Sequence, residues 1–595
     1  MMKKLFLILS FALTAIASWA VKAYPEPVVI TQSDGTKLTV VAHGDEDFHW
    51  FTTTDGVLLV QQENAFYIAE IDESGNVMAS QQLAHDQHER SASEQQLVRA
   101  QHPRRDAFFH KATNRRLKAM QQRISIGTAK PSYFPHMGEP RAMVILVQFS
   151  DTTFVSSNPK RIFNRYLNEE GVPPNYGSVL QYFNDMSGGL FRPQFDLFGP
   201  VTLPKPSAYY GKDQGNSKDV NLKEMIQSAC ESINDTVDFS SYDADKDGYV
   251  DLVYIIYAGY SQSITGNSSD CIWPKSGTIS GGTYDGVTVS RYGVNNELNL
   301  TPTYKYGKIV NGIGLFCHEF SHTMGLPDVY PTTADAQAVD NQALEYWDLM
   351  DAGEYTNTGY TPTPYTPWEK EVMGWTEIEE LTEEAQITLP EDKFYRINSD
   401  TNNEYLILQN LQNTGWASGI IGQDDLQCHG LLVYRIDYSN ANGTPFTSVN
   451  LSDYPNNTAG KPGITLAPAD GLIISSYRTY GSDEAKKTAD KPYSTAEYRY
   501  SHTGDPYPGS QNVTQLLSVQ MNRCTIEKPL YNIKENDGII TFDFLKDITT
   551  LGIENAATEE PAESGEIYDL QGRRMSETTL RKGIYMKKGR KFVVR

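Results

Sequence analysis

Cysteine is scarce in this sequence. Five cysteines are scattered over 595 residues, which excludes a small protein built on a disulfide framework. In an oxidising compartment Cys230 can pair with Cys271, and Cys428 with Cys524, and the sequence leaves this pairing open. Cys317 lies in an apolar stretch, where we expect a buried free thiol.

Positive charge is also in deficit. The chain has 51 Lys and Arg residues against 74 Asp and Glu residues, which gives a net charge of −23 at pH 7. Binding of nucleic acid requires a basic surface, so this balance argues against a nucleic-acid partner. An acidic surface fits an exported protein, and carboxylates can hold divalent cations.

Long hydrophobic runs are absent, and no stretch reaches the length of a membrane-spanning helix. The short apolar run Leu5–Ala17 follows two lysines and precedes small residues, which is the pattern of a secretory signal peptide cleaved after Ala20 or Ala23. No cysteine follows the run, as a lipoprotein would need. We therefore expect a signal peptide at 1–23 and a protein that is secreted or held at the cell surface without a stable membrane span.

The length of the chain indicates more than one hydrophobic core. Short strand-like runs separated by SDG, TDG and ESG turns open the N-terminal part. Alternating helices and strands follow, as in an α/β domain, and then a strand-rich part typical of a sandwich. The predicted parts are a signal peptide (1–23), an N-terminal α+β segment (24–125), an α/β domain (126–380), an all-β sandwich-like domain (381–547), and an acidic linker with a small tail (548–595).

Two histidines four residues apart, His318 and His322, are the most informative pattern in the chain. In a helix these positions share one face, so their imidazoles can hold one metal ion. Glu319 lies beside that face, where it can take a proton from a water molecule that attacks a peptide carbonyl. In an exported chain this HExxH pattern predicts a zinc peptidase, in which Zn²⁺ lowers the pKa of the water to about 7.

The residues after the second histidine predict a third ligand. Gly325 suits the end of a helix, and Pro327 prevents the helix from continuing. The chain can therefore turn back and present Asp328 to the metal. Glu345 is the alternative ligand, because its distance along the chain falls in the range that other zinc peptidases use.

A methionine, Met350, follows the HExxH pattern further along the chain. The segment EYWDLMDAGEY (345–355) resembles the Met-turn of metzincins, in which Met350 would form an apolar floor beneath the metal. The alternative is that Met350 only fills the core. Tyr355 and Tyr346 are nearby candidates for the residue that stabilises the transition state.

An acidic loop, DADKDGYVD, resembles the first nine positions of a calcium-binding loop. The glutamate that completes an EF-hand is missing, because Tyr254 occupies its position. We expect a structural Ca²⁺ loop inside the α/β domain, and the alternative is an acidic turn without an ion. The candidate ligands are Asp243, Asp245, Asp247, the carbonyl of Tyr249, and Asp251.

Several segments together resemble the immune inhibitor A-like secreted metallopeptidases (peptidase family M6). They are HEFSHTMGLPDVY, YWDLMDAGEY, TPWEKEVMGW, DADKDGYVDLVYIIYAG, HGLLVYRID and, near the N-terminus, GDEDFHW. The resemblance covers about residues 25–510. It implies a metzincin-like zinc endopeptidase made as a proenzyme, with 24–125 as the prosegment. The chain departs from many metzincins at Asp328, where they have a third histidine.

The tail, with IYDLQGRR and KGIYMKKGRKFVVR, resembles short C-terminal sorting segments of Bacteroidetes secreted proteins. The alternative is a small β module of unrelated use.

Two functions are compatible with these patterns. The first is a secreted zinc metalloendopeptidase that hydrolyses peptide bonds of extracellular proteins or peptides. The second is a surface protein that binds a glycan or protein ligand and carries an accessory or inactive peptidase domain. The presence of His318, Glu319 and His322 together favours the first.

The prosegment of such a peptidase would cover the cleft and place a carboxylate or imidazole at the metal. It would be cleaved between about Arg99 and Lys130. The alternative for this polar stretch is a charged, solvated helix.

Overall fold

The computed structural model describes the chain from residue 18 to residue 594. The parts outside the description are 1–17, 21–22, 25, 45–48, 63–64, 74, 106–107, 109–131, 172, 215–216, 265–269, 301–306, 401–403, 421–427, 438–453, 481–486, 548–565, 570–573, 577–579, 588–589 and 595. Most of the predicted signal peptide, most of the predicted cleavage stretch and the acidic linker therefore lie outside the described residues.

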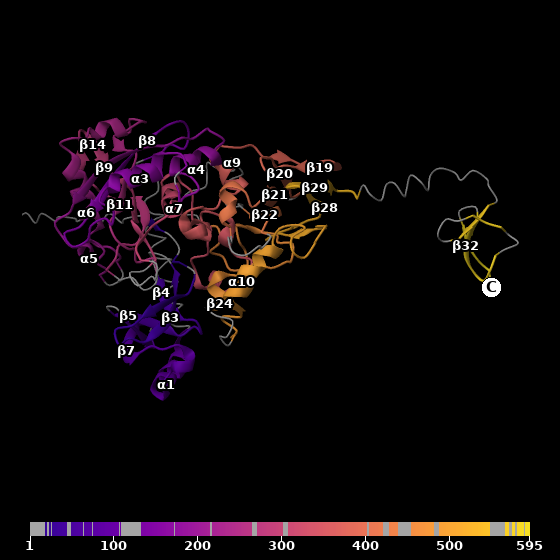
Figure 1. Cartoon of the computed structure of the whole chain (residues 1–595), viewed down its shortest axis with the longest axis horizontal. Coiled ribbons are helices and arrows are strands. Elements are labelled where there is room, and N and C mark those ends of the chain that lie inside the picture. Colours follow the sequence, from indigo (N-terminus) through magenta and orange to yellow (C-terminus); the bar gives the residue numbers. More distant parts are fainter. Residues whose placement is uncertain are drawn as a thin grey trace, which may run out of the picture.

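The N-terminal part is an antiparallel sheet with one helix. Neighbouring strands in the sheet follow each other in sequence: β2 (Val28–Thr31), β3 (Lys37–Gly44), β4 (His49–Thr53), β5 (Leu58–Gln62), β6 (Ala65–Ile71) and β7 (Val77–Leu83). Helix α1 (Ala92–Gln101) begins at Ser91, which forms a capping box with Glu94, and packs against β6. Figure 1 shows this part below the α/β part of the molecule.

The central part contains a six-stranded mixed sheet with the strand order β1-β12-β15-β11-β8-β9. Its parallel strands are β8 (Arg141–Gln148), β9 (Gln194–Thr202), β11 (Val253–Tyr257) and β15 (Arg291–Asn296). The strand β12 (Lys275–Thr278) runs antiparallel to β15. At the edge, β1 (Ser18–Ala20) pairs antiparallel with β12, although it belongs to the predicted signal peptide.

Helices cover both faces of this sheet. Alternate side chains of each strand point to opposite faces, so one strand contributes to the core on each side. Val144 and Leu146 of β8 pack with α3 (Pro159–Asn168), α4 (Val179–Met186) and α7 (Gly314–Thr323). Ile145 and Val147 pack on the other side, against α6 (Leu222–Ile233). This arrangement agrees with the α/β domain expected from the sequence.

The strand-rich part that follows has two sheets with a shared core. One sheet contains β18 (Glu379–Glu380), β20 (Phe394–Asn398), β21 (Glu404–Leu411), β22 (Gly430–Asp437) and β23 (Ile464–Leu466), and the other contains β19 (Ala385–Leu389), β28 (Leu530–Asn536) and β29 (Ile539–Phe544). Leu406 and Leu408 of β21 face the second sheet, whereas Ile407 points the other way and joins the core around α7. The sandwich and the α/β part therefore share hydrophobic core.

The remaining elements are short. They are α5 (Ser207–Tyr210), β10 (Tyr249–Val250), β13 (Thr283–Tyr284), β14 (Val287–Val289), β16 (Leu298–Asn299), β17 (Ile309–Val310), α8 (Ala334–Gln337), the 3₁₀ segments η4 (Glu345–Trp347) and η5 (Ala352–Gly359), α9 (Pro367–Val372), β24 (Thr479–Tyr480), β25 (Tyr493–Ser494), α10 (Thr495–Ser501), β26 (Val519–Gln520) and β27 (Thr525–Ile526). The tail forms its own sheet from β30 (Ile567–Asp569), β31 (Arg574–Met575), β32 (Gly583–Lys587) and β33 (Arg590–Val594). Within the described ranges, no helix combines the length and apolarity needed to cross a membrane.

Candidate metal centre

The helix α7 carries the HExxH pattern into the core, and all of its residues are buried. It lies so close to η5 that a Cβ atom at Gly314 would be 2.1 Å from the carbonyl oxygen of Glu354. Glycine at this position therefore permits the segment with Glu354 and Tyr355 to lie beside the helix that carries the two histidines.

Three side chains converge at the C-terminal half of α7. The Nε2 atoms of His318 and His322 are 3.1 Å apart. The Oδ1 atom of Asp328 is 3.3 Å from Nε2 of His318 and 3.1 Å from Nε2 of His322. All three residues are buried. The three donors thus form one compact group on the described part of the chain.

Hydrogen bonds orient both imidazoles toward the centre of this group. Nδ1 of His318 lies 2.9 Å from the carbonyl oxygen of Leu349, and Nδ1 of His322 lies 2.7 Å from that of Leu326. A carbonyl oxygen only accepts, so each Nδ1 carries a proton and donates it. In the neutral rings, both Nε2 lone pairs then face the carboxylate of Asp328. Three electron-rich atoms this close together require a cation or added protons.

Asp328 is ionised at neutral pH. Burial alone would raise its pKa, but the adjacent His322 and His318 hold the pKa at about 2. The chain reaches this position as the sequence predicts, because α7 ends at Thr323 and Gly325 follows with φ 107°.

Residues of the sandwich part hold the loop that carries Asp328. The side-chain amide of Asn456 donates to the carbonyl oxygens of Val329 at 2.5 Å and Ile464 at 2.8 Å. The side chain of Asn457 accepts a hydrogen bond from the backbone N–H of Thr332 at 2.6 Å. The position of Asp328 therefore depends on a segment far beyond α7 in the sequence.

Glu345, the alternative third ligand, lies elsewhere. It is fully buried, and its carboxylate accepts hydrogen bonds from the backbone N–H of Ser476 at 3.0 Å and from the hydroxyl of Tyr498 at 2.9 Å. It does not join the group formed by His318, His322 and Asp328.

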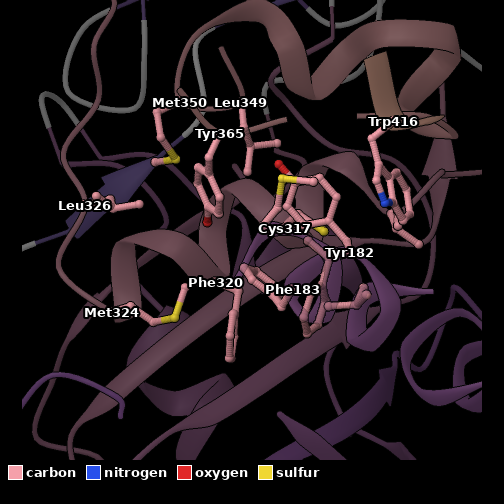
Figure 2. Packing of buried hydrophobic residues seen from close by; sticks show 14 of the residues in the cluster. Tyr182, Phe183, Cys317, Phe320, Met324, Leu326, Leu349, Met350, Tyr365 and Trp416 are labelled. Atoms are coloured by element: carbon pink, nitrogen blue, oxygen red, sulfur yellow. The ribbon is translucent and has the colours of Figure 1, made fainter. Parts of the chain in front are cut away.

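Met350 lies in a tight turn beside the group. The backbone N–H groups of Asp351 and Gly353 both donate to the carbonyl oxygen of Asp348, at 3.3 and 2.9 Å. The carbonyl oxygen of Met350 accepts from the N–H of Val329 at 3.1 Å, next to the third donor. Figure 2 shows the Met350 side chain in the core that α7 shares with its neighbours. The turn thus connects the Asp328 loop to this core.

Glu319 and Glu354 place two further carboxyl groups near the donors. Glu319 is fully buried. Burial and the charge of Glu319 raise the pKa of Tyr254. Oε2 of Glu354 lies 4.0 Å from Nδ1 of His318, and burial raises the pKa of Glu354, although His318 acts in the opposite direction. Glu354 carries no motif that marks it in the sequence; a charged residue within the buried stretch MDAGEY is the signal that points to it.

The acidic loop is folded as a turn. The carboxylates of Asp243, Asp245 and Asp247 have oxygen atoms within 4.8 Å of one another. Asp251 lies outside that group, where its Oδ2 atom accepts from the N–H of Ala244 at 3.1 Å. Burial raises the pKa of Asp251 to about 6, and the neighbouring loop carboxylates raise it further. Tyr249, at the start of β10, donates its N–H to Asp247 Oδ1 at 2.9 Å.

The residues just after the predicted signal peptide lie beside the candidate metal centre. The ring of Tyr24 packs edge-on against that of Tyr355, with centroids 5.2 Å apart. Ala23 packs with Leu315 of α7 in a small apolar cluster. The hydroxyl of Tyr346 lies 3.4 Å from a carboxylate oxygen of Glu26 and so contacts the N-terminal segment. No described carboxylate or imidazole of that segment joins the three donors.

Comparisons with known proteins find relatives among peptidases for part of the chain. Residues 139–376 match the family model of the immune inhibitor A peptidase M6 catalytic domain. The pre-pro-metalloprotease PrtV of Vibrio cholerae serotype O1 is 24% identical over 222 residues, which cover 33% of this chain and 24% of PrtV. Immune inhibitor A of Bacillus thuringiensis subsp. alesti is 24% identical over 288 residues, 40% of each chain. The chain therefore covers less than half the length of these curated relatives.

Proposed function

Because residues 139–376 belong to the M6 peptidase family, we propose that this protein is a secreted zinc-dependent endopeptidase that hydrolyses peptide bonds of extracellular proteins. The observation that carries the proposal is the buried group of His318, His322 and Asp328. Each neutral imidazole has its proton on Nδ1, so the unprotonated Nε2 atoms and the carboxylate oxygen face one another. One matched relative, PrtV, is named as a pre-pro-metalloprotease, which is consistent with this assignment.

The donor set fits zinc. Two imidazole nitrogens and one carboxylate oxygen are ligands that Zn²⁺ accepts, and three protein ligands leave a position open in catalytic zinc sites. Bound at this position, Zn²⁺ would lower the pKa of a water molecule and polarise the carbonyl of the substrate. Met350 would form the apolar floor beneath it, in the manner of a metzincin.

Glu319 is the candidate catalytic residue. It follows His318 on α7, so its carboxylate lies beside the metal group and not within it. In the reaction Glu319 takes a proton from the attacking water and delivers it to the nitrogen of the leaving amine. Tyr355, on η5 near Glu354, is the candidate for a hydrogen bond to the oxyanion of the transition state.

The N-terminal part acts as a prosegment in this proposal. Tyr24, the first residue of the prosegment, packs on Tyr355, so the segment would obstruct the approach of a substrate. Blocking is thus achieved by covering the site, and the described residues give no support for a prosegment carboxylate or imidazole at the metal.

The acidic loop is proposed as a structural calcium site. Three aspartates held close together repel one another unless a cation is present, and carboxylate oxygens are the ligands that Ca²⁺ prefers. The loop joins η3 (Phe239–Tyr242) to β10 at the edge of the α/β part, so a bound ion would stabilise that part and not take part in the reaction.

The proposed activity is tested with casein as the substrate. Purified protein, expressed from residue 24, is assayed after N-terminal processing, with and without a zinc chelator, and its metal content is measured. We expect stoichiometric zinc, cleavage of casein, loss of cleavage with chelator, and recovery on addition of zinc. The Glu319→Gln variant should retain zinc and lose at least about a hundredfold in rate. Processed protein without zinc and without cleavage would favour the alternative, a binding protein with an inactive peptidase domain.

A further inference from the structure

One carboxylate of the N-terminal segment is held by two residues from other parts of the chain. Glu26 forms an ion pair through Oε2 with the guanidinium of Arg499. Its other oxygen, Oε1, lies 3.4 Å from the hydroxyl of Tyr346. The Glu26 side chain is about 21% exposed, so this is a partly desolvated contact and stronger than an exposed surface pair.

Arg499 and Tyr346 are held in place by residues outside the N-terminal segment. Arg499 lies on α10, which begins with a capping box between Ser494 and Glu497. The Tyr346 ring packs near that of Tyr498, with centroids 6.1 Å apart. The hydroxyl of Tyr498 in turn donates to buried Glu345 at 2.9 Å. The backbone at Arg499 and the ring of Tyr346 are therefore supported by residues other than Glu26.

The contact lies close to the candidate metal centre. Tyr24, two residues before Glu26, packs on Tyr355. Tyr355 follows Glu354, whose carboxylate is 4.0 Å from Nδ1 of His318. Two residues of extended chain span about 7 Å. An acidic side chain that reaches Arg499 and Tyr346 therefore belongs to a residue within a few positions of a chain segment that packs on Tyr355, beside the helix with the two histidines.

The chemistry of the two residues selects a carboxylate. A guanidinium presents a planar fork of N–H donors that matches a carboxylate, and the phenol adds a third donor. The hydrogen bond to Glu26, and then the charge of that carboxylate, raise the pKa of Arg499 above its usual value, although burial acts in the opposite direction. The whole chain carries a net charge of −23, so a fixed cation near the reaction site distinguishes acidic from neutral side chains locally.

We propose that Arg499 and Tyr346, once the N-terminal segment has been removed, select substrates with Asp or Glu a few residues from the bond that is cut. In the unprocessed chain, Glu26 occupies this position as a substrate carboxylate would. This inference rests on the proposed peptidase function and adds a substrate class to it.

The test uses protein that has been expressed from residue 24 and has completed its own processing. Cleavage products of a mixed peptide library are identified by mass spectrometry, which locates any acidic position relative to the cut. Two synthetic peptides that differ only by Glu or Gln at that position are then compared. We expect the Glu peptide to have a kcat/KM about tenfold higher, because Gln offers Arg499 a neutral acceptor in place of a charged one. The difference should shrink as salt is added.

Variants identify the residues responsible. Arg499→Gln should reduce the preference for Glu over Gln to about onefold and leave kcat/KM for the Gln peptide within about twofold. Tyr346→Phe should reduce the preference in part. The matched control is Arg523→Gln, which removes an arginine that pairs with Asp437 in the sandwich part, and it should leave the preference unchanged.

Three outcomes separate the inference from the proposed function. Absence of cleavage of every library peptide by zinc-loaded protein contradicts the peptidase function itself. Cleavage with equal rates for the Glu and Gln peptides contradicts the inference and leaves the function intact. A salt-sensitive preference for Glu that persists in Arg499→Gln and Tyr346→Phe assigns the selectivity to other residues and overturns the proposal. If Arg499→Gln fails to fold, the Tyr346→Phe variant and the salt dependence of the wild type still decide.

Discussion

Asp328 Oδ1 and His322 Nε2 lie 3.1 Å apart in a fully buried site, although the Nδ1 of the histidine already donates its proton to the carbonyl of Leu326. Two acceptors at this distance attract each other only through a shared cation or an added proton. The adjacent His322 and His318 hold the pKa of Asp328 at about 2 against the effect of burial, so the carboxylate is charged at neutral pH. The structure is therefore preorganised for a metal ion before one is bound.

The first prediction concerns the third ligand. Asp328→Asn should lose bound zinc, because one of three ligands becomes a neutral, weak donor. Glu345→Gln should keep stoichiometric zinc, since Glu345 already accepts from Ser476 and Tyr498. Metal analysis of both variants after dialysis measures this. Zinc retained in Asp328→Asn and lost in Glu345→Gln would show that the alternative ligand is the correct one.

A second prediction concerns the support of the Asp328 loop. Asn456→Ala removes the hydrogen bonds to the carbonyls of Val329 and Ile464 without touching the metal. We expect zinc affinity to fall by about 10- to 100-fold, as for other residues that orient metal ligands. Competition with a zinc indicator gives the affinity. The control is Asn410→Ala, which removes side-chain amide hydrogen bonds to the carbonyls of Leu389 and Gly538 elsewhere in the sandwich part. It should bind zinc normally, and equal losses in both variants would indicate a general loss of stability.

The third prediction tests the acidic loop for calcium binding. Addition of Ca²⁺ in large excess should raise the melting temperature by about 5 °C, because the ion binds the folded loop and stabilises it by mass action. Asp245→Ala should abolish most of this shift, whereas Asp392→Ala, in a turn of the sandwich part, should not. Differential scanning calorimetry in the inactive Glu319→Ala background avoids self-cleavage. An identical shift in all three proteins would remove the loop from consideration.

Latency gives a fourth prediction. Glu319→Ala protein, expressed from residue 24, should remain full length, bind zinc and leave casein intact. Wild-type protein should shorten from the N-terminus, by cleavage between about Arg99 and Lys130, at the time activity appears, because Tyr24 and its neighbours obstruct the site until then. N-terminal sequencing of timed samples follows the cleavage. Full activity in uncut wild-type protein would show that the N-terminal part does not cause latency, and its role would then be in folding or docking.

The fifth prediction is a pH dependence. Lys491 is 5% exposed, and burial, together with nearby Arg105, lowers its pKa from about 10.5 to about 8. Between these two values the unfolded state binds a proton that the folded state lacks, so the free energy of unfolding should rise from pH 8 toward pH 10.5. Below pH 8 the buried charge destabilises the fold by up to about 3 kcal/mol.

Lys491→Met should therefore be more stable than the wild type at pH 7, and the difference should disappear as the pH approaches 10.5. The exposed-site control Lys546→Met should follow the wild type at every pH. Denaturant unfolding in the Glu319→Ala background provides the free energies. A constant difference between Lys491→Met and the wild type across this range would mean that Lys491 keeps its ordinary pKa.

Local patterns in the sequence predict much of this molecule. The HExxH spacing and Gly325 predict α7 and its end, and the apolar run around Met143 predicts the central strand β8. These features depend on residues close together in the chain, where periodicity and capping are decisive. The grouping of His318 and His322 is predictable for the same reason.

Other parts of the site depend on residues far apart in the sequence. Glu354 approaches His318 because Gly314 lets two backbone segments nearly touch, which no local pattern reveals. The ion pair between Glu26 and Arg499 joins the N-terminal segment to helix α10, which lies hundreds of residues later in the sequence. Such contacts follow from tertiary packing, so a single sequence does not predict them.

The Asn456 contact also orders events in time. Residues up to Asp328 are synthesised well before residue 456, so the third donor lacks the support of Asn456 until the later part of the chain is present. An incomplete chain would contain the two histidines and an aspartate whose position is not yet fixed, and such a site binds metal weakly. Full assembly of the three-donor group therefore waits until the sandwich part has folded, and under the proposed function the chain would have no complete metal site before then.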